Sequence, residues 1–222
     1  MHSAKDLPGE LPPGLGIVAV PGRADPRDVL IGPAGGLDSL PAGGTVATGS
    51  PRRAAQLRLL RPDAAFVEIR GNVGTRLDKL AGGVADALVL AAAGLARLGL
   101  RPPGMTPLDV GSCVPAPGQG ALAIEGRADR SDLAGAVASL DHADTAACVR
   151  AERAVLAGLG GGCREPIGAI GAVDGGTLTL VAFAATQDGA AHARDEIAGR
   201  PGDAERLGGE LAARLRERLG GR

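Results

Sequence analysis

The chain has 222 residues, 45% of them hydrophobic and 22% charged, which is typical of a soluble globular protein and enough for more than one domain. Lysine and arginine (24) nearly balance aspartate and glutamate (25), which excludes the overall basic surface of nucleic-acid-binding and membrane-surface proteins. Aromatic residues make up only 1%, which argues against base-stacking platforms. We therefore expect neither a nucleic-acid nor a membrane partner.

The three cysteines, Cys113, Cys148 and Cys163, fit neither a disulfide framework nor the ligand spacing of a zinc site. The N-terminus lacks the apolar core of a signal peptide, and no segment is apolar over the length of a membrane span. These features predict a cytoplasmic protein that holds no metal ion.

The first 22 residues hold a polar run from His2 to Pro8 and a possible strand at residues 16–20. So short a stretch cannot bury a core of its own. We expect it to pack on another part of the chain.

Residues 44–98 alternate between strand and helix patterns, which predicts a parallel sheet covered by helices in a domain of residues 24–114. Ser50 before Pro51 is typical of a helix start, and Asn72 can cap the next helix. The expected strands are residues 45–47, 65–69 and 87–90. Three helices are expected: one that begins at Pro51, one at residues 73–80, and one that ends at Leu98.

A stretch rich in proline and glycine, residues 115–120, interrupts this alternation before an apolar strand at 121–125. Beyond Asp141 the patterns predict a small α+β domain, with antiparallel hairpins joined at Asp174-Gly175-Gly176 and Asp188-Gly189. Its expected elements are a helix at 145–156, strands at 167–173, 177–184 and 191–197, and a last helix with leucines at 207, 211, 215 and 219.

Arginines near predicted strand ends indicate an anionic ligand. Arg52 and Arg53 follow the cap Ser50 in the first turn of a helix, where backbone N–H groups and the helix dipole already favour anions. Arg70, Arg76 and Arg97 belong to the next two strand–helix units. If these arginines converge at the carboxyl ends of the strands, they would bind a phosphate or a carboxylate. The alternative is that the arginines at the start of the helix are simply solvated.

Two further places can carry chemistry. Asp6 beside Lys5 can stay ionised and stabilise a developing positive charge, although such pairs are usually surface ion pairs. Cys163 lies on a glycine-flanked loop next to Arg164, which favours a reactive thiolate, whereas buried cysteines are usually inert packing, as we expect for Cys113 and Cys148.

In their order along the chain, these motifs resemble those of the porphobilinogen deaminase family, also called hydroxymethylbilane synthases. The resemblance covers nearly the whole chain. The matching segments are His2-Ser3-Ala4-Lys5-Asp6-Leu7-Pro8, Asp25-Pro26-Arg27-Asp28, Ser50-Pro51-Arg52-Arg53, Arg70-Gly71-Asn72-Val73-Gly74-Thr75-Arg76-Leu77, Leu90-Ala91-Ala92-Ala93-Gly94-Leu95, Pro117-Gly118-Gln119-Gly120-Ala121, Ala151-Glu152-Arg153 and Gly161-Gly162-Cys163.

The resemblance implies a monomeric cytoplasmic transferase that condenses four porphobilinogen units into hydroxymethylbilane and releases ammonia. It implies that Cys163 carries a covalent dipyrromethane cofactor and that Asp6 is the catalytic residue, which stabilises a cationic azafulvene. The cofactor would be held by Cys163, Lys5, Asp6, Ser50, Arg52, Arg53 and Arg70, and the substrate by Arg76, Arg97 and Gln119.

The implied fold is α/β, with two lobes like those of periplasmic binding proteins, the first incomplete, and a small C-terminal α+β domain. The division is residues 1–22 with 117–138 for the first lobe, 24–114 for the second, and 142–222 for the C-terminal domain.

Members of this family carry a long stretch before the segment that matches His2 to Pro8, so we expect a truncated chain or a misplaced start and incomplete strand pairing in the first lobe. Retention and loss of the family activity are both open at this point. The alternatives are a non-catalytic binding module for a small carboxylate, which would leave Asp6 and Cys163 without roles, and an unfolded remnant.

Overall fold

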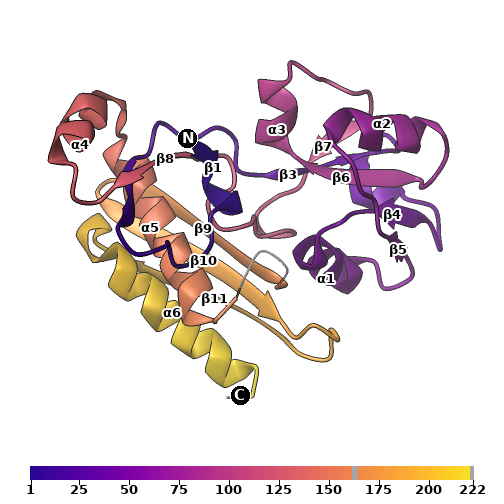
Figure 1. Ribbon diagram of the computed structural model, residues 1–222. Helices are drawn as coiled ribbons and strands as arrows, with labels where there is room; N and C mark the ends of the chain where they lie inside the picture. The colour runs from indigo at the N-terminus through magenta and orange to yellow at the C-terminus, as the bar shows by residue number, and fades with distance from the viewer. Residues whose placement is uncertain (162–164, 221–222) are drawn as a thin grey trace. The chain divides into compact units, whose positions relative to one another are not determined.

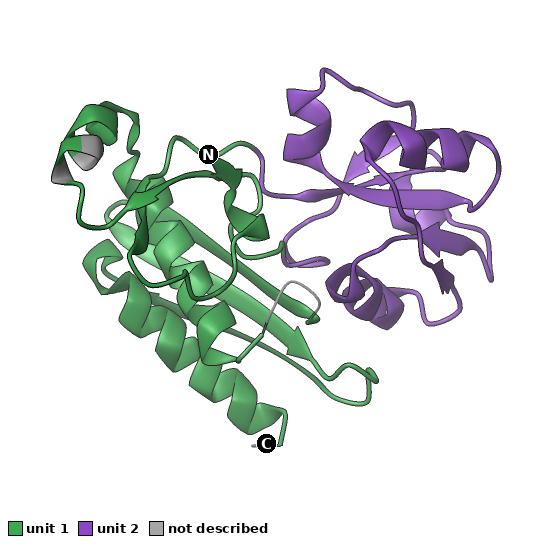
Figure 2. Ribbon diagram, in the orientation of Figure 1, with its two compact units in different colours: residues 1–24, 115–222 green, residues 25–114 purple. Residues whose placement is uncertain are grey.

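The computed structural model describes residues 1–161 and 165–220 (Figure 1). These residues divide into two compact units, shown in Figure 2. Unit 1 combines residues 1–24 with 115–222, and unit 2 is the continuous stretch 25–114. The expected second lobe therefore corresponds closely to unit 2. The separation of unit 1 into a first-lobe portion and a C-terminal domain stays a prediction.

Unit 2 is built on a five-stranded mixed sheet with the order β5-β4-β6-β3-β7. Its strands are β3 (Asp28–Ile31), β4 (Thr45–Ala47), β5 (Ala65–Val67), β6 (Ala87–Ala91) and β7 (Met105–Pro107). Strands β4, β5 and β6 are parallel, but β3 runs antiparallel to both β6 and β7. The parallel pairing expected for residues 44–98 is confirmed for β4, β5 and β6, but the complete sheet is mixed because it also contains β3 and β7, which the sequence patterns did not indicate.

Alternating side chains along these strands divide between two apolar cores. Leu30 and Val46 face helix α1 (Pro51–Leu60), whose Leu57 packs in the same cluster. Their neighbours Val29 and Ala47 face the other side, where α2 (Val73–Ala81) and α3 (Ala92–Arg97) cover the sheet. Helices therefore cover both faces, as the sequence predicts.

The predicted caps of unit 2 are confirmed. The Ser50 hydroxyl accepts a hydrogen bond from the backbone N–H of Arg53, and the Asn72 side chain accepts one from that of Thr75. Pro51 occupies the first turn of α1, where its missing N–H has no helical partner to lose. These caps fix where α1 and α2 begin and hence where their arginines lie.

Unit 1 contains two three-stranded antiparallel sheets, with the orders β1-β8-β2 and β11-β10-β9. The first consists of β1 (His2–Ser3), β2 (Leu15–Ala19) and β8 (Leu122–Arg127), and the second of β9 (Ile167–Asp174), β10 (Thr177–Ala185) and β11 (His192–Gly199). The helices are α4 (Ser131–Val137), α5 (Ala143–Gly158) and α6 (Ala204–Arg218). The expected hairpins are confirmed.

Helix α5 is the centre of unit 1 because it packs against both sheets. Ala147, Ala151 and Val155 join the core between β9–β11 and helix α6. Ala146 and Val149 join the core beneath the sheet β1-β8-β2. The N-terminal residues thus pack on another part of the chain, as expected. Among the described residues, no helix is long and apolar enough to cross a membrane.

Candidate functional site

A short turn of 3-10 helix, Ala4–Asp6, follows β1 and carries Lys5 and Asp6. Asp6 is exposed to solvent, whereas Lys5 is half-buried and its Nζ lies 3.5 Å from Oε1 of Gln119. The backbone N–H of Ala4 donates to the carbonyl of Ala121, which anchors the turn to the start of β8. The structure therefore brings together three of the predicted site residues.

Gly118 lets the loop of residues 117–120 approach this turn. Its φ is +76°, and an added Cβ would lie 2.9 Å from the carbonyl carbon of Ala4 and from the amide nitrogen of Lys5. Only a residue without a side chain fits there, so the loop and the Lys5–Asp6 turn are packed as one piece.

Gly118→Ala is expected to destabilise unit 1 by roughly 1–3 kcal/mol and to displace the turn that carries Asp6. Gly14→Ala is the matched control, because Gly14 has a similar φ of +85° but no heavy atom within 4 Å of an added Cβ. Urea unfolding of both variants isolates the steric contact from the backbone strain. Equal losses for the two substitutions would mean that the contact at Gly118 is easily relieved.

Arg23 and Glu152 form a buried ion pair in contact with the loop of residues 117–120. Arg23 donates from Nη1 and Nη2 to the two carboxylate oxygens of Glu152, at 2.5 and 2.9 Å, and from Nε to the carbonyl of Gln119. Glu152 also accepts from the backbone N–H groups of Gly118 and Gly171, at 2.6 and 2.8 Å. One carboxylate on α5 thereby holds the loop 117–120 against β9.

The corresponding buried centre of unit 2 is Asp28, whose carboxylate binds two arginines from α1. Asp28 Oδ1 accepts from Nε and Nη2 of Arg53, at 3.0 and 2.7 Å, and Oδ2 lies 2.8 Å from Nη2 of Arg52. Burial opposes the charge on Arg52, but the Asp28 carboxylate outweighs it and raises the pKa of that guanidinium. Arg53 also donates to the carbonyl of Val89 in β6.

Both guanidiniums therefore lie beneath α1 instead of projecting from its N-terminus. Arg52 and Arg53 are only 3% and 6% exposed. The role in anion binding predicted for these two arginines stays a prediction, and it would require them to exchange partners.

The other predicted cations of unit 2 lie at its surface. Arg70 follows β5 and pairs with Glu68, with 84% of the Arg70 side chain exposed. Half-buried Arg76 donates from Nε to the carbonyl of Gly71, and Arg97 is exposed at the end of α3. Because β4, β5 and β6 are parallel, the segments that follow them share one edge of the sheet, as the sequence predicts.

At that edge a shallow groove of about 240 Å³ lies between the start of α1 and the end of β5. Ser50 lines it, and the guanidinium of Arg58 stacks on the ring of Phe66, 5.0 Å from the centroid. Gly49 permits the close approach of the two loops, since an added Cβ would lie 2.9 Å from the carbonyl oxygen of Ile69.

Cys113 and Cys148 are buried free thiols, as expected for inert packing positions. Burial raises the pKa of each thiol to about 11, from an ordinary value of 9.0. Neither is therefore a thiolate near neutral pH. The predicted cofactor cysteine, Cys163, lies outside the described residues.

The raised pKa of Cys113 predicts a loss of stability in alkali. The folded thiol holds its proton more tightly than the unfolded one, so this stabilisation is complete below about pH 9 and is lost as the pH rises through about 11. The free energy of unfolding of unit 2 should fall by roughly 2–3 kcal/mol over that window. In urea unfolding, the free energy of unfolding of Cys113→Ala should depend less on pH between 9 and 11 than that of the wild type. An equal pH dependence in the two proteins would mean that Cys113 does not cause the loss of stability.

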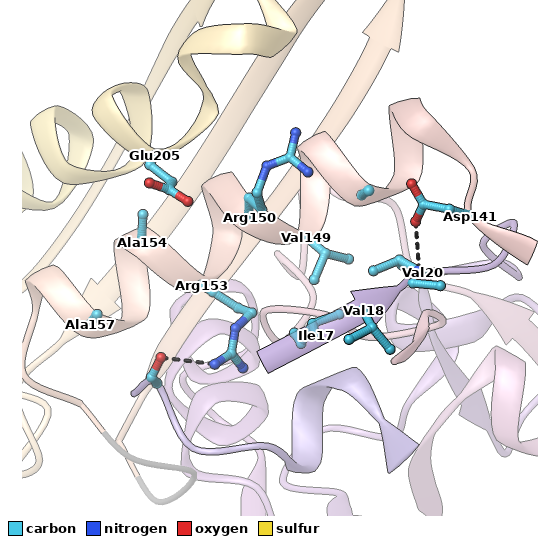
Figure 3. A pocket seen from close by; sticks show the side chains of 13 residues that line it. Ile17, Val18, Val20, Asp141, Val149, Arg150, Arg153, Ala154, Ala157 and Glu205 are labelled. Carbon is cyan, nitrogen blue, oxygen red and sulfur yellow. Dashed lines mark hydrogen bonds between the residues drawn. The ribbon is translucent and has the colours of Figure 1, made fainter. Parts of the chain in front are cut away.

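A larger groove, of about 550 Å³, lies between β2 and α5 in unit 1 (Figure 3). Arg153 reaches across it and donates from Nη2 to the carbonyls of Pro8 and Gly9, while Nη1 is buried without a hydrogen-bond partner in the described part of the chain. Burial lowers the pKa of this guanidinium. Lys5, Asp6 and Gln119 are not among the described residues that line this groove, so it is distinct from the Lys5–Asp6 turn.

The sequence motifs agree with comparisons to known proteins. A family model described as porphobilinogen deaminase, dipyromethane cofactor binding domain, matches residues 1–135. A second, described as the C-terminal domain of porphobilinogen deaminase, matches residues 146–217. The chain belongs to the porphobilinogen deaminase family.

Relatives within the porphobilinogen deaminase family are similar over almost the entire chain. The enzyme of Acidothermus cellulolyticus is 52% identical over 97% of this chain and 66% of its own length. Those of Trichlorobacter lovleyi and Thermus thermophilus are each 50% identical, over 97% and 99% of this chain and 69% and 74% of their own lengths. The chain thus spans 66–74% of the length of these porphobilinogen deaminases.

Two solved structures share a weaker likeness. The ancestral amino acid-binding protein AncCDT-1, a precursor of cyclohexadienyl dehydratase, has a TM-score of 0.30 and 19% identity over 55% of this chain and 51% of its own. YhfZ from Shigella flexneri has a TM-score of 0.29 and 18% identity over 58% of this chain and 55% of its own. The two-lobe arrangement like that of periplasmic binding proteins stays a prediction.

Proposed function

We propose that this chain carries out the porphobilinogen deaminase reaction, in which porphobilinogen units are joined into hydroxymethylbilane with release of ammonia. Membership of the family carries this proposal, because two family models together match most of the chain. The proposal includes a dipyrromethane cofactor attached to the thiol of Cys163, a monomer in the cytoplasm, and the two lobes and C-terminal domain expected from the sequence.

The described residues fit a cofactor that bears several carboxylates. Lys5 and Arg70, two of the proposed cofactor-binding residues, are cationic side chains at or near the surface of their units. Ser50 would contribute to the binding of an anion at the start of α1, a helix of ten residues whose dipole favours negative charge at this end. The bound dipyrromethane supplies the carbon atom to which the first substrate unit is joined.

Arg76, Arg97 and Gln119 are proposed to bind the acetate and propionate groups of porphobilinogen. Gln119 is only 1% exposed and is aligned by the contact of its Oε1 with Lys5 Nζ. Because charge-assisted hydrogen bonds are worth about 1.5–3 kcal/mol each, a few arginines suffice to hold a substrate with two carboxylates.

Asp6 is proposed as the catalytic residue. Its carboxylate is solvent-exposed in the ligand-free chain, on a turn that Gly118 and Ala121 fix in place. There it can accept hydrogen bonds from pyrrole N–H groups and stabilise positive charge as the amine departs.

Asp6→Asn is expected to lower the rate of hydroxymethylbilane formation about 10²–10⁴-fold, the range over which positioned acids and bases contribute. The neutral amide keeps the shape of the side chain but loses the charge. Glu10→Gln, an exposed substitution on the same N-terminal segment, is the control and should leave the rate unchanged. A rate for Asp6→Asn within a few-fold of wild type would exclude Asp6 from the reaction.

Intact mass spectrometry tests the proposed cofactor attachment. Wild-type chain supplied with porphobilinogen should gain the mass of a dipyrrole, and Cys163→Ser should not. Cys148→Ser is the control. Because the Cys148 thiol is buried in α5, its replacement should leave the adduct on Cys163 intact. An unmodified wild-type chain that remains folded by circular dichroism would contradict the proposal, and reversible binding of porphobilinogen without an adduct would favour a binding module.

A further inference from the structure

The crossing from unit 2 into unit 1 is held by side chains of α1. Val114 is the last residue of unit 2 and Pro115 the first residue of the returning segment of unit 1. The N–H of Val114 donates to Oε1 of Gln56 at 2.7 Å. Its carbonyl accepts from Nε2 of Gln56 at 3.1 Å and from Nη1 of Arg52 at 2.6 Å.

We propose that Arg52 and Gln56 form a latch on Val114, and that a ligand carboxylate opens it by drawing Arg52 away. Gln56 is the positioning residue of the latch, because it lies one turn after Arg52 on α1 and binds both backbone groups of Val114. The opening step rests on the proposed function, which requires Arg52 to bind an anion.

The burial of the latch makes its bonds consequential. Arg52, Gln56 and Val114 are 3%, 4% and 0% exposed, so a donor or acceptor that loses its partner there is not compensated by bulk water. On the other side of the crossing, the carbonyl of Pro115 accepts from the backbone N–H of Ala169 in β9, at 2.9 Å. Val114 is therefore held within unit 2 while the latch is closed, and Pro115 is held within unit 1.

The strengths of the competing bonds favour opening by a carboxylate. Arg52 donates to the carboxylate of Asp28, to the neutral carbonyl of Val114 and, at 3.5 Å, to the sulfur of Cys113. A hydrogen bond to a charged acceptor is roughly twice as strong as one to a neutral acceptor. A ligand carboxylate at the start of α1 would therefore replace Val114 as the acceptor before it replaced Asp28.

Cys113 provides a built-in probe of the latch. Its thiol is fully buried, donates to Oδ2 of Asp28 at 3.4 Å, and accepts from both latch side chains, from Nη1 of Arg52 at 3.5 Å and from Nε2 of Gln56 at 3.8 Å. Release of Val114 would expose this thiol to an alkylating reagent. Cys148 is buried in unit 1, so its rate of alkylation reports on local unfolding of unit 1.

The test is the rate of alkylation of each cysteine in the native full chain, measured by iodoacetamide labelling and peptide mass mapping. Gln56→Ala and Arg52→Gln should each label Cys113 at least about tenfold faster than wild type, which corresponds to about 1.4 kcal/mol of opening free energy, and leave Cys148 unchanged. Gln187→Ala, which removes an exposed glutamine bonded to Glu165, should change neither rate.

Val46→Ala separates release of the latch from general weakening of unit 2, because Val46 packs in the same core as Cys113 but does not contact the latch through a hydrogen bond. At equal loss of thermal stability, the latch variants should label Cys113 faster than Val46→Ala. Equal rates for all three variants, or no acceleration in Gln56→Ala, would overturn the latch.

Porphobilinogen added to the wild-type chain should accelerate labelling of Cys113, and should have no further effect on Arg52→Gln. An adduct on Cys163 without this acceleration would overturn the opening step and leave the proposed function intact. If porphobilinogen neither forms an adduct nor binds, both the proposed function and the opening step are overturned. Whether the latch exists is decided separately, by the labelling rates of Cys113 in Gln56→Ala and Arg52→Gln without porphobilinogen.

Discussion

Replacing Glu152 by alanine is expected to lower the free energy of unfolding of unit 1 by about 3–5 kcal/mol, because it leaves the charge of Arg23 buried and unpaired. Glu152 is fully buried and accepts four hydrogen bonds, two from Arg23 and two from backbone N–H groups at Gly118 and Gly171. The loss would be a large fraction of the stability of a typical domain, which is about 5–15 kcal/mol.

Urea unfolding followed by circular dichroism, with amide exchange in β9 as a reporter of unit 1, measures this effect. Glu210→Gln is the matched control: Glu210 pairs with Arg206 and Arg214 on the exposed face of α6, and loss of exposed pairs costs at most about 1 kcal/mol. A cost for Glu152→Ala as small as that of the control would mean that water or another side chain takes over the partners of Glu152.

Asp28→Asn should destabilise unit 2 to a similar extent, by about 3–5 kcal/mol. The substitution preserves the shape of the side chain but removes the charge that balances Arg52 and Arg53, both of which are buried. Because α1 carries both arginines, its anchorage to the sheet should weaken first.

Amide exchange in β4 and β6 measures this loss separately from unit 1, where exchange in β9 should be unaffected. Asp25→Asn is the control, since the Asp25–Arg27 pair is exposed and three residues away in the same segment. If the amides of β4 and β6 exchanged as slowly in Asp28→Asn as in the control, the prediction would be wrong. Arg52 and Arg53 would then have found other acceptors within unit 2.

Much of the fold could be predicted because local signals mark it. Ser50-Pro51 and Asn72 mark where α1 and α2 begin, and the glycine turns after Asp174 and Asp188 mark the hairpins. Strands β3 and β7 were missed because both lie outside the strand–helix alternation of residues 44–98, and their antiparallel pairing depends on residues distant in the sequence.

The site was less predictable, since a sequence does not show which way a side chain points. Arg52 and Arg53 fit a helix start that binds anions, yet both turn inward to Asp28. Asp28 and Glu152 were missed as buried charges. Each nevertheless gives a signal, namely a lone acid at the head of an apolar strand or among the alanines of a helix.

The discontinuity of unit 1 sets the order in which the protein can form during synthesis. Unit 2 is complete once residue 114 has been made, whereas Arg23 must wait for Glu152, which lies 129 positions later. At about 5–20 residues per second, residues 1–24 remain without their sheet and ion-pair partners for about 6–26 s after they are made. We therefore expect unit 2 to fold before unit 1 during synthesis, and residues 1–24 to be open to chaperones and proteases in that interval.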